Sequence, residues 1–127
     1  QAQQGAGDDL PVWADLSVKL FSPEETDLLG QTLSRIDGAT VMTYFDTENA
    51  ILKWAQIAVD SAGLPTEIGV ELSDKAPASD RITEWTPSRR SAFHTKLIES
   101  MSDSPFFSGI ALHDYTGLSG SSNGDRR

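Results

Sequence analysis

The chain contains no cysteine, which excludes disulfide scaffolds, thiolate zinc sites and cysteine nucleophiles. Basic residues are also few, because ten Lys and Arg stand against 19 Asp and Glu and the formal net charge is −9. Phosphate binding needs clustered cations, so we expect no nucleic-acid partner. No apolar run approaches the roughly 18 residues that a membrane span needs, so we expect no membrane span either.

The 127 residues fit one domain of ordinary size, and 38% apolar residues are enough for a folded core. We expect a lead-in segment at 1–9, an α/β domain at 10–118 and a disordered Gly/Ser-rich tail at 119–127. The sequence starts at Gln1 and lacks the charged and apolar regions of a signal peptide. Either a leader was removed or the chain is a piece of a longer protein, and the pattern below favours the second.

Four apolar runs rich in β-branched and aromatic residues predict strands at 10–16, 39–45, 66–72 and 110–115. Helical patterns lie between them, so the predicted order is βαβαβαβ with parallel strands and right-handed crossovers. The first three strands start about 30 residues apart, a spacing typical of a (β/α)₈ barrel or a doubly wound sheet. No glycine-rich nucleotide loop follows any strand, which weakens the nucleotide-binding form of the open sheet.

The helix boundaries carry capping signals. Ser22 followed by a proline and a glutamate predicts the start of the first helix as a capping box, and Gly38 is expected to end it. Asp46 or Thr47 is expected to cap the second helix, and the run Thr86-Pro-Ser88 is expected to start the third.

Alternation along the strands separates an apolar face, expected under the helices, from a polar one. The polar face collects residues that we expect near the carboxyl ends of the strands: Trp13, Asp15, Tyr44, Asp46, Glu71, His113 and Tyr115. Glu67 shares this face and is expected at the far end, where a solvated role suffices. Carboxylates beside aromatic rings suit a site that binds and hydrolyses a sugar.

Asp46 and Glu71 are the candidate catalytic residues of this face, and the others are candidates for substrate binding. Trp85, beside the polar loop at 74–82, is a further binding candidate. Each has a plainer interpretation. Asp46 can be a helix cap, Glu71 an ion-pair partner, His113 a structural hydrogen-bonding residue and Trp13 a core residue.

The segment Val41-Met-Thr-Tyr-Phe-Asp46 resembles the Met-Thr-Tyr-Asp motif on strand six of family 18 glycoside hydrolases. The run from Gly109 to Tyr115 falls where these barrels have their last strand. Two features depart from the family pattern: Phe45 separates the tyrosine from the aspartate, and His113 and Tyr115 stand in place of the usual tryptophan. The resemblance implies that 10–118 is the C-terminal half, strands five to eight, of a (β/α)₈ barrel.

The family's catalytic motif, Asp-x-x-Asp-x-Asp-x-Glu on strand four, does not occur in the chain. The resemblance therefore implies a polysaccharide-directed glycosidase whose general acid lies in an N-terminal half outside this sequence. Two alternatives stay open: a barrel relative that binds carbohydrate without cleaving it, and a free-standing α/β domain with an unrelated ligand. We expect no cofactor and no metal site, a carbohydrate partner, and self-association through exposed half-barrel edges.

Overall fold

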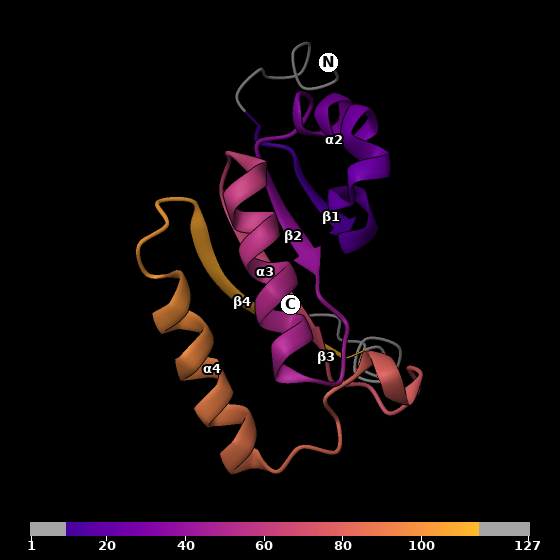
Figure 1. Cartoon of the computed structure of the whole chain (residues 1–127), viewed down its shortest axis with the longest axis vertical. Helices are drawn as coiled ribbons and strands as arrows, with labels where there is room; N and C mark the ends of the chain where they lie inside the picture. Colours follow the sequence, from indigo (N-terminus) through magenta and orange to yellow (C-terminus); the bar gives the residue numbers. More distant parts are fainter. Residues whose placement is uncertain (1–9, 115–127) are drawn as a thin grey trace.

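The computed structural model describes residues 10–114 (Figure 1). The elements follow in this order: β1 Trp13–Ser17, η1 Val18–Phe21, η2 Pro23–Glu25, α2 Thr26–Leu33, β2 Gly38–Met42, α3 Glu48–Ala62, β3 Thr66–Glu71, η3 Ala78–Asp80, α4 Pro87–Met101 and β4 Phe107–His113. The predicted alternation of strands and helices is confirmed; the segments at 1–9 and 119–127 lie outside the described residues. Among the described helices, none combines the length and apolar character needed to cross a membrane.

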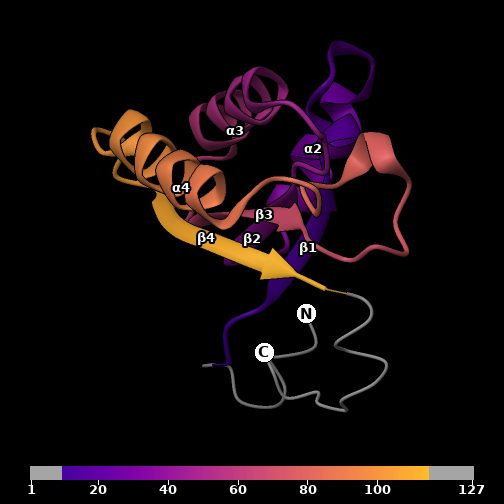
Figure 2. The ribbon, with the colours of Figure 1, turned by 90° about the horizontal axis from the view of Figure 1, so that it is seen from below.

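The four strands form one parallel sheet in the order β1-β2-β3-β4. Helices α2, α3 and α4 lie on one side of this sheet, and no described helix covers the other side (Figure 2). The fold is therefore α/β, with a sheet whose two faces meet different surroundings. This difference decides which strand residues form the core and which are open to a ligand.

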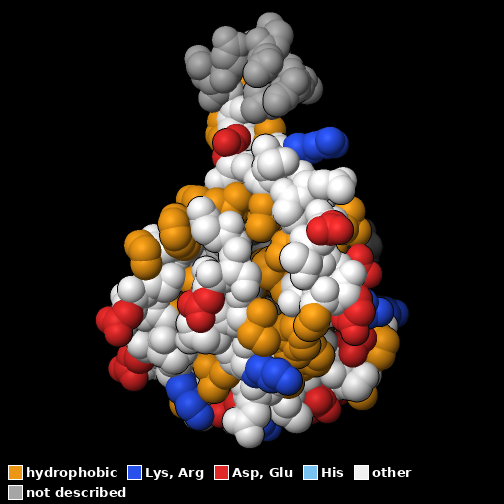
Figure 3. All heavy atoms as spheres, turned by 45° about the horizontal axis from the view of Figure 1, so that its top comes forward, with side chains coloured by type: hydrophobic (Ala, Val, Ile, Leu, Met, Phe, Trp, Pro, Cys, Tyr) orange, Lys and Arg blue, Asp and Glu red, His pale blue; other side chains and the backbone are white. Residues whose placement is uncertain are grey.

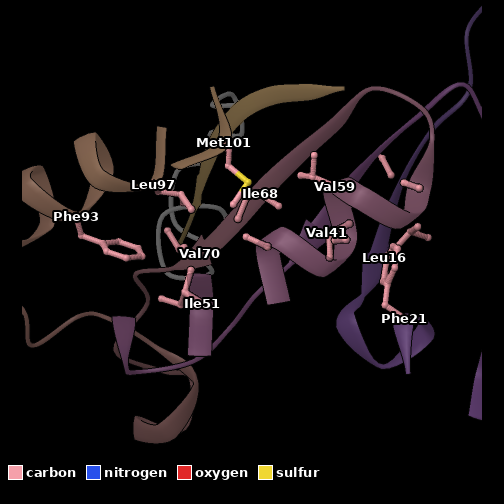
Figure 4. Packing of buried hydrophobic residues seen from close by; sticks show 14 of the residues in the cluster. Leu16, Phe21, Val41, Ile51, Val59, Ile68, Val70, Phe93, Leu97 and Met101 are labelled. Carbon is pink, nitrogen blue, oxygen red and sulfur yellow. The ribbon is translucent and has the colours of Figure 1, made fainter. Parts of the chain in front are cut away.

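The core lies between the sheet and the helices (Figure 4). It combines the helix-facing strand residues with one stripe each of α3 and α4: Leu16, Val41, Ile68, Val70, Ile51, Ala55, Val59, Phe93, Leu97 and Met101. Fully burying a large aliphatic or aromatic side chain contributes about 1.5–3 kcal/mol, so this face supplies much of the folding free energy. On the outer surface, apolar side chains are interspersed with acidic ones (Figure 3).

The predicted starts of the two long helices are confirmed, and a threonine caps each of them. Thr47 Oγ1 accepts a hydrogen bond from the backbone N–H of Ala50 at the start of α3, at 3.2 Å. Thr86 Oγ1 does the same for Arg89 at the start of α4, at 3.1 Å. Gly63 ends α3 in the left-handed conformation, with φ of 69°, which costs little without a side chain.

The first helical segment differs from the prediction. Ser22 does not cap it, because its hydroxyl donates to the carbonyl of Lys19, and the following turn is the 3₁₀ helix η2. The α-helix is only eight residues long, contains no fully buried residue and leaves Leu28 exposed. Gly38 does not terminate it either, since this glycine is the first residue of β2.

Candidate functional site

The register of the strands arranges the uncovered face into rows that run across the sheet. One row contains Asp15, Thr40, Glu67 and Gly109, and the next contains Ser17, Met42, Gly69 and Ala111. Glu71 pairs with His113 in a further row, at the carboxyl ends of β3 and β4. The alternation predicted from the sequence therefore places these two residues on neighbouring strands of one face.

Tyr44 joins the row of Glu71 and His113 from beyond the end of β2. This strand is shorter than predicted, because Thr43 donates both its N–H and its hydroxyl to the carbonyl of Gly69, each at 2.9 Å, and the chain then leaves the sheet. The Tyr44 hydroxyl hydrogen-bonds Nδ1 of His113, and the two rings meet edge to face with centroids 5.6 Å apart. The structure thus brings together three of the predicted site residues.

Glu71 is the most unusual member of this row, because its side chain is only 1% exposed. Its Oε2 accepts a hydrogen bond from the N–H of Ser73 at 2.7 Å. Taking a carboxylate out of water costs several kcal/mol unless the surroundings compensate, so such residues concentrate at sites with a chemical task. Glu71 stays a predicted catalytic residue, and its burial distinguishes it from the exposed Asp15 on the same face.

Gly69 lies between Glu67 and Glu71 on β3, and the imidazole of His113 and the methyl group of Thr40 occupy the space beside it. A Cβ at this position would lie 3.2 Å from Cε1 and 3.5 Å from Nε2 of His113, and 3.3 Å from the methyl group of Thr40. The imidazole edge therefore extends over the glycine. Sequence reasoning placed Gly69 on this face but gave it no role; only the position of the histidine shows that role.

A bulge in β4 decides which way His113 faces. The register shifts between Thr66 and Glu67, whose partners are Phe107 and Gly109, so Ser108 is the extra residue. Gly109 has φ of 120°, a conformation that side chains rarely permit. The bulge lets Phe107 and Ile110 both pack toward the helices, and the alternation that follows directs His113 to the uncovered face.

A second polar chain lies nearer the amino ends of the strands. The indole N–H of Trp13 donates to Thr40 Oγ1 at 2.9 Å, and the Thr40 hydroxyl donates to Glu67 Oε1 at 2.8 Å. Glu67 was expected on this face in a solvated role, and its hydrogen bond to Thr40 was not predicted. The period-two alternation was the signal that could have found this pair.

The prediction that all candidates lie near the carboxyl ends of the strands is wrong for Trp13. It is the first residue of β1 and pairs with Gly38, the first residue of β2, so it lies at the opposite end from His113. Its ring is 48% exposed and covers Gly38. Asp15, one row further along, pairs with Thr40 and is exposed.

Trp85 and Asp46 are not brought into this cluster. Trp85 is 6% exposed within the helix-side core, edge to face with Phe93 and under the guanidinium of Arg89. Its indole N–H donates to the backbone carbonyl of Asp46 at 3.3 Å, while the Asp46 residue is exposed. Thr47, rather than Asp46, supplies the helix cap. Tyr115 lies outside the described residues.

The loop after β3 runs beside Glu71 and is held by Arg81. The Arg81 guanidinium donates to the carbonyls of Asp74 and Ala76, at 3.0 and 2.6 Å, and pairs with Glu84. The hydrogen bond raises the pKa of Arg81 and lowers the pKa of Glu84. The N–H of Ile82 returns to the Glu71 carbonyl at 2.9 Å, so the loop is anchored at the carboxyl end of β3.

Between residues 10 and 114, no three His, Asp or Glu side chains converge as metal ligands would. Comparison with protein families, with curated proteins and with solved structures finds no match to the chain. The assignment of a function therefore depends on the geometry of the uncovered face.

Proposed function

We propose that the chain supplies four consecutive strand–helix units of a (β/α)₈ barrel, and that its uncovered face binds carbohydrate. The sheet is parallel and sequential, and the described helices lie on one side of it. A barrel wall has this organisation, with helices outside and a polar, ligand-binding inner face toward the carboxyl ends of the strands. Within residues 10–114, β1 and β4 are the edge strands of the sheet, and further strands of a barrel would pair with them.

The row of Tyr44, Glu71 and His113 carries the proposal for a sugar ligand. A phenol, an imidazole and a carboxylate stand at the carboxyl ends of neighbouring strands, and the imidazole packs over Gly69. Sugar hydroxyls each donate and accept hydrogen bonds. Tyr44 and His113 are partly exposed and can pair with them directly, and the buried Glu71 carboxylate adds negative charge beside them. Aromatic rings add apolar contact for the faces of sugar rings.

The charge of this face argues for a neutral ligand. Its strand residues include Asp15, Glu67 and Glu71, and none of its strand residues is Lys or Arg. A phosphate or carboxylate ligand would meet repulsion, whereas a hydroxyl can donate to a carboxylate in a charge-assisted hydrogen bond.

We propose binding, rather than complete hydrolysis, for this chain alone. The resemblance to family 18 assigns the general acid to a strand that precedes these four. Glu71 would then assist hydrolysis by orienting the substrate only in a completed barrel.

Calorimetry with neutral oligosaccharides tests the proposal. A panel of chito-, cello-, xylo- and malto-oligosaccharides is titrated into the 127-residue chain, and the best ligand is then titrated into Glu71→Gln and Tyr44→Phe. Hydrogen bonds to charged groups contribute about 1.5–3 kcal/mol, so Glu71→Gln should weaken binding roughly 10- to 150-fold.

Glu99→Gln is the matched control, because Glu99 is an exposed carboxylate on α4 and its loss should leave the affinity unchanged. Circular dichroism checks that each variant folds. Absence of binding to every sugar at millimolar concentration, or equal affinities of Glu71→Gln and the control, would contradict the proposal.

A further inference from the structure

Two edges of the His113 imidazole contact other residues, Tyr44 and Gly69. Nδ1 is bonded to the Tyr44 hydroxyl, and the Cε1–Nε2 edge extends over Gly69. His113 also pairs in register with Glu71, whose carboxylate is buried. Nδ1 is therefore engaged inside the protein, whereas no hydrogen bond joins Nε2 to another described residue, and His113 is partly exposed.

The hydrogen bond between the Tyr44 hydroxyl and Nδ1 of His113 determines which nitrogen of the neutral imidazole carries the proton. A neutral imidazole has one nitrogen that donates and one that accepts. An imidazole nitrogen is a far stronger base than a phenol oxygen, so the Tyr44 hydroxyl donates the hydrogen bond and Nδ1 accepts it. The proton of the neutral ring is therefore on Nε2.

We propose that His113 is a hydrogen-bond donor to the ligand through Nε2–H, and that Tyr44 and Gly69 are the positioning residues that fix the tautomer and the position of its ring. Tyr44 selects the tautomer, and the missing side chain at Gly69 gives the ring its place. A Cβ there would crowd Cε1 at 3.2 Å and force the ring to move by a few tenths of an ångström. The ligand assignment rests on the proposed function; the tautomer does not.

This donor refines the class of ligand. On either side of Gly69, the same face of β3 carries the acceptors Glu67 and Glu71. A group that accepts from Nε2–H and donates to a carboxylate is a hydroxyl. A hydroxyl meets both requirements without the negative charge that Glu67 and Glu71 would repel, so the arrangement favours a hydroxylated ligand that is not an anion.

Long-range ¹H–¹⁵N correlation spectra of the uniformly labelled full chain test the tautomer without any ligand. The spectra are recorded at a pH where imidazoles are neutral. The chain has two histidines, and His94 is exposed on α4, so it is an internal reference for an unconstrained ring. His94→Gln assigns the signals. We expect His113 to carry its proton on Nε2; a proton on Nδ1, or a tautomer mixture like that of His94, would overturn the proposal.

Tyr44→Phe removes the hydroxyl and should shift His113 toward the mixture shown by His94. Trp13→Phe is the matched control, because it removes the indole N–H at the other end of the same face and should leave the tautomer unchanged. Gly69→Ala should shift the His113 Cε1–H signal and spare that of His94. An unchanged tautomer in Tyr44→Phe, or an unchanged His113 signal in Gly69→Ala, would refute the positioning roles. A chain with the Nε2–H tautomer but no sugar affinity would contradict the proposed function alone.

Discussion

Replacing Gly38 with alanine should destabilise the protein by displacing the Trp13 ring. A Cβ at this position would lie 2.2 and 2.3 Å from two ring carbons of Trp13, distances that cannot persist. The backbone is fixed here, because the N–H of Gly38 and the N–H of Asp37 both donate to the Val12 carbonyl. The indole is half exposed, so it is the part that will move.

The cost follows from what the ring loses. Its hydrogen bond to Thr40 contributes about 1 kcal/mol net. Loss of about 100 Å² of buried aromatic surface at roughly 25 cal/mol per Å² costs up to about 2.5 kcal/mol. Alanine is better than glycine in a strand by about 0.5–1 kcal/mol, which offsets part of the loss. The free energy of unfolding should fall by about 1–3 kcal/mol.

Urea denaturation followed by circular dichroism measures this change, and Gly30→Ala is the control. Gly30 lies inside α2, and a Cβ there would meet no atom within 4 Å. This variant should therefore raise the free energy of unfolding by about 0.5–1 kcal/mol. If Gly38→Ala were as stable as the wild type or as Gly30→Ala, the position of the Trp13 ring in this account would be wrong.

Three further outcomes are expected. Thr47→Ala and Thr86→Ala should each lower the free energy of unfolding by about 1 kcal/mol in urea titrations, because each removes a helix cap, whereas the exposed Thr95→Ala should change it little. Arg81 lowers the pKa of Glu84, so this pair stabilises the fold at pH values above the ordinary carboxyl pKa. The stabilisation is lost as the pH falls through the lowered pKa. In a curve of unfolding free energy against pH, Glu84→Gln should reduce the slope in this acidic range. Light scattering should show self-association of the isolated chain through its bare sheet edges, and a monodisperse monomer would count against the half-barrel proposal.

The parts of the fold that depend on local sequence could be predicted. Thr86 before a proline is a cap in any context, and Gly63 ends α3 because the left-handed conformation is a local property. Alternation on β3 placed Ile68 toward the helices and Glu71 on the other face, because successive strand side chains point in opposite directions.

The parts that depend on pairing between distant segments could not be predicted. Trp13 was expected near the wrong end of the sheet because its position depends on the register between β1 and β2. Trp85 was considered a ligand contact because nothing local shows that its loop folds back onto α4. The roles of Gly109 in the bulge and of Gly69 under the His113 ring depend on contacts with the neighbouring strand, which the local sequence does not show.

Methyl NMR of two adjacent residues on β4 tests most directly that the uncovered face is the binding site. Ala111 pairs with Gly69 on that face, whereas Leu112 pairs with Val70 and lines an apolar cavity of about 220 Å³ beside α4. Leu112 is 61% exposed, so both methyl groups can report on a ligand. During titration with the best-binding oligosaccharide, the Ala111 methyl signal should shift and the Leu112 signals should stay in place. Shifts at Leu112 with a silent Ala111 would place the ligand on the helix side and contradict the account.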